Sequence, residues 1–235
     1  MRKFLSVIVI VLLSETLYAQ GQMAALIHLN ANVFECGSLQ YKDGRVEEYK
    51  FVSIPRANMA SIAVSNESKT KGIKEVDVNE LVSVTIWHEK FPEKKTTLYH
   101  VEADKVLLLP TNVWGFPIAS SEWGTLYQCY LTYTMYVDCG NLEGDLYIVD
   151  GVPDPIYCYL QCRDFEKAQI ISYIQYKVYG FVNGHNKIKE GKKAWVRVPK
   201  KVAEVFASHP NVAERIKKKE LQALDMQLIL DEMAQ

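Results

Sequence analysis

Apolar and polar residues alternate over much of the chain, and this alternation predicts that the region 21–198 is rich in β-strands. The clearest alternation lies in Thr125–Asp138, whose odd positions are mainly apolar and whose even positions are mainly polar or aromatic. Asp43-Gly44 stands between two shorter runs and predicts a tight hairpin turn, because Asp-Gly readily adopts positive φ angles. Further strands are predicted at Leu146–Val149, Ile156–Gln161, Ala168–Val178 and Ala194–Val198.

The spacing of the apolar residues changes after Pro199. Val202 and Phe206 fall on one face of a helix, and a three-to-four spacing continues from Val212 to Leu228. The pattern predicts two or three short helices in a tail that spans residues 199–235. Strands followed by helices predict an α+β fold, in which an antiparallel β-rich domain carries these helices on one side or end of its sheet.

The first twenty residues have the three zones of a secretory signal peptide. Arg2 and Lys3 supply the positive start, Phe4–Leu13 is an apolar run, and the more polar end predicts cleavage after Ala19 or Gln20. The apolar run is about half of the roughly 20 residues that a membrane-spanning helix needs, and no second long run follows. We therefore expect an exported soluble protein, periplasmic or secreted, without a transmembrane segment.

Charge is balanced over the whole chain, with 27 Lys and Arg against 28 Asp and Glu, so nothing global indicates a nucleic-acid partner. The balance is uneven locally, because most charged side chains between Lys187 and Lys219 are basic. This stretch is consistent with a peripheral contact with the cell envelope or with an anionic polymer. It is more typical of a solvated helical face with lysine-rich turns, and we favour that interpretation over the envelope contact.

Five cysteines are present, at positions 36, 129, 139, 158 and 162. In an exported protein such cysteines are more often disulfide partners than metal ligands. We expect one of Cys158 and Cys162 to bridge to Cys129 on an adjacent strand, with Cys139 as the other candidate partner. The five histidines are scattered along the chain, so no metal site is predicted.

Tyrosine is concentrated late in the strand region, where ten of the fourteen tyrosines lie between residues 127 and 179. Tyr130 and Tyr136 share the even-numbered, wetter face of the strand predicted at Thr125–Asp138. Because tyrosine combines flat apolar area with a polar tip, this face predicts a binding site for a glycan, a peptide or another protein. The alternative is that the helices of the tail cover the same face.

The sequence contains no phosphate-binding glycine loop, no Gly-x-Ser-x-Gly elbow and no His-Glu-x-x-His helix. We therefore expect no cofactor, and a non-enzymatic protein that acts by binding or assembly in the cell envelope. The alternative is an exported hydrolase that uses a Cys/His pair or carboxylates, since His88 or His100 could meet a cysteine across paired strands.

Several short segments follow one another in a characteristic order: Gly37 before Asp43-Gly44, then Ile73–Val78, Trp123–Tyr127 and Tyr157–Leu160, and lastly the helical segment from Phe206 to Leu230. In this order the chain resembles a group of uncharacterised exported Bacteroidota proteins, in which a β-rich domain precedes a short helical tail. The resemblance covers most of the chain after residue 20. It implies an envelope location and a β-then-helix layout, and it assigns no catalytic residue.

Overall fold

The computed structural model describes residues 34–55, 57–89, 91–106, 109–129, 146–148, 156–182 and 185–235. The predicted signal peptide, Tyr130, Tyr136 and Cys139 lie outside the described residues. The strand predicted at Thr125–Asp138 is therefore described only as far as Cys129. Among the helices of the described ranges, none has the length and apolar character that crossing a membrane requires.

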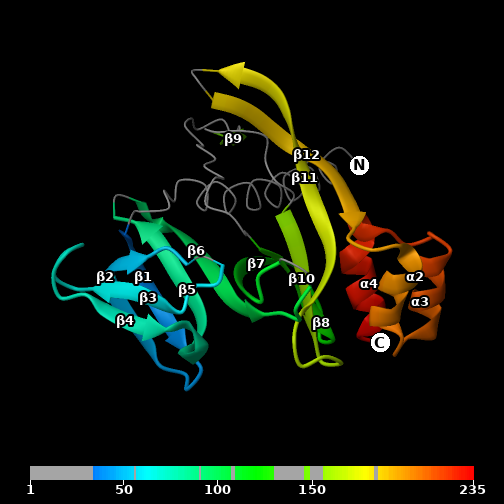
Figure 1. The fold of residues 1–235 in the computed structure, drawn as a ribbon, viewed down its shortest axis with the longest axis horizontal. Coiled ribbons are helices and arrows are strands. Elements are labelled where there is room, and N and C mark those ends of the chain that lie inside the picture. The colour runs from blue at the N-terminus through cyan, green and yellow to red at the C-terminus, as the bar shows by residue number, and fades with distance from the viewer. Residues whose placement is uncertain are drawn as a thin grey trace, which may run out of the picture.

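Twelve strands of the described residues form one antiparallel sheet, in the order β4-β3-β2-β1-β5-β6-β7-β8-β10-β11-β12-β9 (Figure 1). Their bounds are β1 Phe34–Tyr41, β2 Val46–Ser53, β3 Ser61–Ser65, β4 Lys74–Asp77, β5 Leu81–His88, β6 Phe91–Glu102, β7 Asn112–Ser120, β8 Gly124–Cys129, β9 Leu146–Ile148, β10 Ile156–Cys162, β11 Gln169–Val182 and β12 His185–Trp195. Most neighbours in the sheet are also neighbours in the chain, so the sheet is built largely from hairpins. The α+β, β-rich fold predicted from the alternation is confirmed.

The N-terminal half of the sheet encloses an apolar cluster of its own. Gly44, in the turn between β1 and β2, has a φ of 89°, a conformation that residues with a side chain rarely adopt. The hairpin predicted at Asp43-Gly44 is thus confirmed. Leu39, Ile62 and Val84, from β1, β3 and β5, are fully buried, and their burial holds this end of the sheet together.

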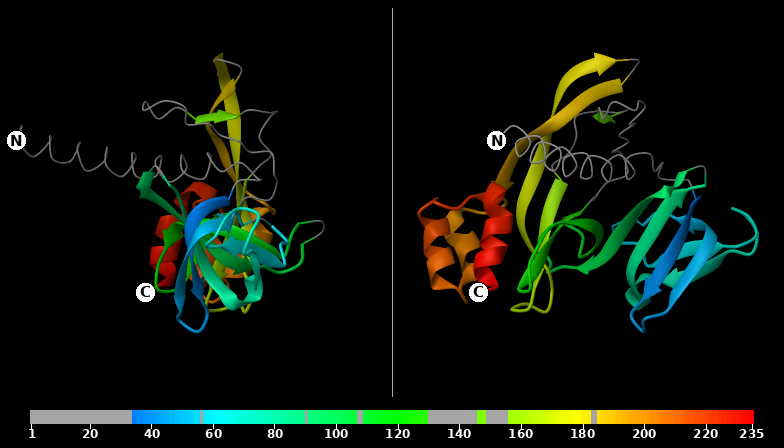
Figure 2. Two further views of the ribbon diagram at one scale, coloured as in Figure 1. Left: turned by 90° about the vertical axis from the view of Figure 1, so that its left-hand side faces the viewer. Right: turned by 180° about the vertical axis from the view of Figure 1, so that it is seen from behind.

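Short helical segments follow the last strand and cover one face of the other half of the sheet (Figures 1 and 2). They are α2 Pro199–Ala203, the 3₁₀ turn η2 Glu204–Phe206, α3 Pro210–Lys217, the 3₁₀ turn η3 Ala223–Asp225 and α4 Met226–Met233. The rings of Trp123, just before β8, and Phe206 lie 5.8 Å apart in one apolar cluster, which also contains Ile216 and Leu230. The tail predicted at residues 199–235 therefore shares a core with the sheet.

The last strand differs from the strand predicted at Ala194–Val198. β12 occupies His185–Trp195 and pairs along almost the whole length of β11. The first lysines of the basic stretch thus lie in a strand, and not in a turn or on a helical face. Hydrogen bonding to a long neighbouring strand outweighs the weak β-propensity of lysine and glutamate.

Candidate functional site

The middle of the sheet, from β6 to β11, has two differently packed faces. Toward the helices it presents Leu126, Leu160 and Ile171, which are buried in the cluster that contains Phe206. On the opposite face lies a smaller cluster around the fully buried Tyr159. Because the helices occupy the first face, the second face is the candidate contact surface.

Three tyrosines on this second face stand in one row across the strands. The row begins at Tyr99 of β6, which pairs with Gly115 of β7. It continues through Cys129 of β8 to Tyr157 of β10, and it ends at Tyr173 of β11. Residues directly opposite each other in antiparallel strands project from the same face. The three tyrosines are each half-buried, so the sheet holds their rings while part of each side chain stays accessible to solvent.

Tyr127 of β8, also half-buried, projects from the same face in the neighbouring row, where it lies directly opposite Tyr159 of β10. Its ring centroid lies 5.8 Å from that of Tyr99, and the two planes are tilted by 47°. Burial raises the pKa of the Tyr127 phenol, so the hydroxyl stays protonated at neutral pH and can donate a hydrogen bond. We name Tyr99, Tyr127, Tyr157 and Tyr173 together the tyrosine face.

Gly115 and Cys129 fill the centre of the row between Tyr99 and Tyr157. A Cβ at position 115 would lie 2.5 Å from the Sγ of Cys129 and 2.7 Å from the carbonyl oxygen of Gln128. The thiol therefore occupies the space that a side chain at position 115 would need. Close packing of β7 against β8 beneath the tyrosine face depends on both residues.

Tyr159 projects from the same sheet face, opposite Tyr127, and is fully buried in the cluster there. Its hydroxyl has no hydrogen-bond partner within the described part of the chain. Burial raises the pKa of this phenol, so the side chain is uncharged. A buried hydroxyl without a partner costs about 1–3 kcal/mol, because water solvates the same group in the unfolded chain.

We expect Tyr159→Phe to keep the fold and to raise the free energy of unfolding by about 1 kcal/mol in urea denaturation, the low end of that range, since it removes only the unpaired hydroxyl. Tyr41→Phe is the matched control, because the Tyr41 hydroxyl donates to Glu47 at 3.1 Å and its removal should not stabilise the protein. A clear loss of stability in Tyr159→Phe would contradict the prediction.

Cysteines of the described strands are thiols, and no disulfide joins them. The register places Cys129 opposite Tyr157 and Cys158 opposite Gln128. Cys158 and Cys162 pack in the helix-covered cluster, whereas Cys129 packs on the other face of the sheet. The bridge predicted from Cys129 to Cys158 or Cys162 is therefore not formed, because the sheet itself separates the side chains.

Burial works against nucleophilic catalysis at Cys129 and Cys162. It raises the pKa of both thiols, and the thiolate is the reactive form of cysteine. The ring of His100 lies 5.0 Å from that of Trp114, and burial, aided by the charge of Lys42, lowers the pKa of the imidazole. The His, Cys, Asp and Glu side chains of the described ranges include no group of three that could hold a metal ion.

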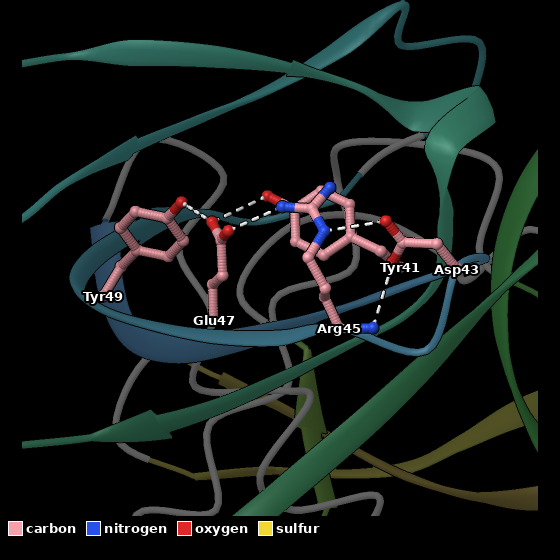
Figure 3. A network of polar contacts seen from close by, with 5 residues as sticks. All are labelled: Tyr41, Asp43, Arg45, Glu47 and Tyr49. Carbon is pink, nitrogen blue, oxygen red and sulfur yellow. Dashed lines mark hydrogen bonds and ion pairs between the residues drawn. The ribbon is translucent and has the colours of Figure 1, made fainter.

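A polar cluster lies on the β1–β2 hairpin, in the N-terminal half of the sheet (Figure 3). Glu47 accepts hydrogen bonds from Tyr49 at 2.5 Å and from Tyr41 at 3.1 Å. Arg45 pairs with Glu47 at 2.8 Å and with Asp43 at 2.7 Å, and its guanidinium stacks 4.3 Å above the ring of Tyr41. All five residues belong to one hairpin and satisfy one another, so the cluster ties its strands together.

Acid titration tests the contribution of Glu47 to this hairpin. The hydrogen bond from Tyr49 is the largest cause that holds the pKa of Glu47 below its ordinary value of 4.5. Because the folded-state pKa is lowered, the stabilisation is complete above pH 4.5 and is lost as the pH falls through the folded-state value. In urea denaturation we expect wild type to be more stable than Glu47→Gln at pH 7 and to lose this advantage progressively as the pH falls below 4.5. Glu48→Gln, on the same strand, controls for the loss of one negative charge, and an advantage that does not change with pH would contradict the prediction.

The two predicted binding residues, Tyr130 and Tyr136, lie outside the described residues and stay predictions. The even-numbered positions that precede them in β8, Leu126 and Gln128, are buried, and Leu126 packs in the helix-covered cluster. The tyrosine face, in contrast, was not predicted from the sequence, because its members come from four different strands. One local signal was present in the sequence. Tyr157 alternates with Cys158, which is buried on the opposite face, and this alternation places Tyr157 on the face away from the helices.

The candidate site is thus a sheet face on which strand pairing assembles tyrosines that are distant in the chain. Burial raises the pKa of the two nearby thiols, Cys129 in the centre of the row and Cys162 on the helix-covered side of the sheet. The geometry therefore suits contact with a ligand better than covalent chemistry. Comparison of the chain with protein-family models, with curated proteins and with solved structures yields no match, and the site is therefore assigned on its geometry.

Proposed function

We propose that this chain is an exported, non-enzymatic protein that binds a partner in the cell envelope through the tyrosine face. One observation carries the proposal: strand pairing brings half-buried tyrosines from β6, β8, β10 and β11 onto the sheet face opposite the helices. The signal-peptide pattern of the first twenty residues and the resemblance to exported Bacteroidota proteins support the envelope location.

Half-buried tyrosines suit a binding surface for physical reasons. Each ring offers flat apolar area and a hydroxyl, and it has only two side-chain torsions to immobilise when a ligand binds. In the tyrosine face the sheet already restrains one side of each ring, which lowers that entropic cost further. A glycan, a peptide or another protein can use such a surface.

The alternative of an exported hydrolase receives less support from the same region. Burial raises the pKa of Cys129 and Cys162, whereas a catalytic cysteine needs a lowered value. Labelling the folded protein with a thiol-directed activity probe separates the two functions. Rapid labelling of a single cysteine, lost on denaturation, would favour the hydrolase.

The binding function is tested with protein recovered from the envelope or the medium of an expressing bacterium, screened against glycan and peptide arrays. We expect Tyr99→Ala and Tyr157→Ala each to weaken binding of the ligand found by roughly 5–30-fold, the range for a truncated aromatic contact of about 1–2 kcal/mol. Tyr49→Ala is the matched control, since Tyr49 is also half-buried but belongs to the polar cluster on the β1–β2 hairpin.

Circular dichroism of each variant shows whether the fold is kept. Unchanged affinity in both folded face variants would remove the tyrosine face as the contact surface. Recovery of the uncleaved precursor from the cytoplasm alone would contradict export.

A further inference from the structure

The tyrosine face continues into the lysines of the β11–β12 hairpin. Along β11, Tyr173, Gln175 and Lys177 alternate with residues such as Ile174, which is buried beneath the helices. The register sets Lys192 of β12 directly opposite Gln175. Because opposed residues share a face and alternate residues of a strand do too, Lys177 and Lys192 lie on the same face as Tyr173.

Packing at the base of the hairpin agrees with this assignment. Trp195 packs against the helix-covered cluster, whereas its neighbour Val196 packs against the cluster on the tyrosine side. The nearest irregularity in the pairing is one extra residue, Gly191, in β12. Gln175 pairs with Lys192 and the next residue of β11 pairs with Glu190, so β11 itself has no extra residue there. The alternation along β11 is therefore unbroken as far as the lysine.

On this face of the hairpin the described positive charges are those of Lys177 and Lys192. Lys177 and Lys192 are exposed, and neither forms an ion pair with a side chain that the structure describes. β12 contains four lysines and one glutamate, and the register sets Lys189 opposite Lys177. The hairpin extends away from β1–β8, and β9 pairs with its outer edge at Asn186–Ile188 (Figures 1 and 2).

We propose that this surface binds an acidic polysaccharide, whose sugar rings lie on the tyrosine face and whose anionic groups meet Lys177 and Lys192. This inference rests on the proposed binding function and specifies its ligand class. The apolar face of a sugar ring packs on tyrosine while its hydroxyls bond to the phenol, and an ammonium group attracts an acid as a point charge. Between Tyr173 and Lys177 the strand rises roughly 13 Å, a span that fits a polymer of several sugars.

Two other anionic partners fit the surface less well. Binding to a lipid surface needs apolar side chains beside the lysines, whereas the described residue between Tyr173 and Lys177 on this face is the polar Gln175. Nucleic-acid binding typically accompanies a strongly basic domain, whereas this chain has a formal net charge of −1. The combination of tyrosines with a few lysines favours a ligand of moderate charge density.

Binding of the exported full-length protein to polygalacturonate tests the inference. The comparison probes are the carboxyl-reduced form of the same polymer, a thymidine oligonucleotide and phosphatidylglycerol vesicles. We expect polygalacturonate to bind best and to bind less tightly as salt is added. The double variant K177S/K192S should weaken this binding by about five- to tenfold, and K69S/K71S, which removes two exposed lysines from the β3–β4 loop, should leave it unchanged.

Each other outcome counts against the inference in a distinguishable way. Equal binding of the carboxyl-reduced polymer, or unchanged affinity in K177S/K192S, would overturn the inference that the ligand is acidic. Neither result would contradict the tyrosine face as a binding surface. Tighter binding of the oligonucleotide or of the vesicles would assign the lysines to that partner instead. No binding to any probe would overturn the inference, while the array screen of Tyr99→Ala and Tyr157→Ala would still decide the proposed function.

Discussion

Phe206→Ala should lower the free energy of unfolding by about 3–5 kcal/mol. Phe206 is fully buried, and its ring packs 5.8 Å from that of Trp123 where the tail meets the sheet. Truncation leaves a cavity lined by several short helices and by the sheet. Helices shorter than about 12–15 residues are marginal on their own, so the tail depends on this contact to stay folded.

Urea denaturation followed by far-ultraviolet circular dichroism measures the effect of Phe206→Ala. Leu224→Ala is the matched control, because Leu224 lies in the same tail but is 65% exposed, and its truncation should change stability by no more than about 0.5 kcal/mol. A loss below about 1 kcal/mol in Phe206→Ala would show that the tail is not anchored through this ring.

Leu39→Ala should lower the free energy of unfolding by about 2–5 kcal/mol, although Leu39 is remote from the tail. Leu39 is fully buried in the N-terminal cluster, which contains no residue of the C-terminal helical tail. The two halves are nevertheless joined by continuous strand pairing through β5, β6, β7 and β8. We therefore expect the loss to appear in the helices as well as in β1–β5, because the strands between them unfold with both.

Hydrogen exchange resolved by peptide measures the coupling of the two halves. Leu39→Ala should speed exchange in the strands around it and in the helical tail, whereas Val46→Ala, at a site 61% exposed on the same hairpin, should alter neither. Faster exchange confined to β1–β5 would show that the helix-packed half is stable by itself.

Local pattern predicted those elements that neighbouring residues control. The Asp43-Gly44 turn is confirmed because its φ preference belongs to the dipeptide, and Gly44 indeed has a positive φ. The strand predicted at Ile156–Gln161 corresponds closely to β10, Ile156–Cys162, whose apolar run is bounded by turn residues. The helical tail follows from the three-to-four spacing of its apolar residues after Pro199.

Strand pairing overrode local preference where a long partner was available. Lysines weaken a strand prediction, so the start of β12 at His185 was not expected from the sequence. The cysteine bridge failed for a related reason: Cys129 and Cys158 are on adjacent strands, but a difference of one position in register sends them to opposite faces.

The sequence by itself determined an export-type leader pattern, a β-then-helix order, the first hairpin and an unusual concentration of tyrosine. Each of these features depends only on residues that are close together in the chain. Only the tertiary structure decided which tyrosines share a face, since Tyr99, Tyr157 and Tyr173 become neighbours through the pairing of β6, β7, β8, β10 and β11. It also decided that Lys177 and Lys192 extend that face. Side chains along a strand alternate between the two faces of the sheet, so a shift of one residue in the register would have placed these side chains on the helix side.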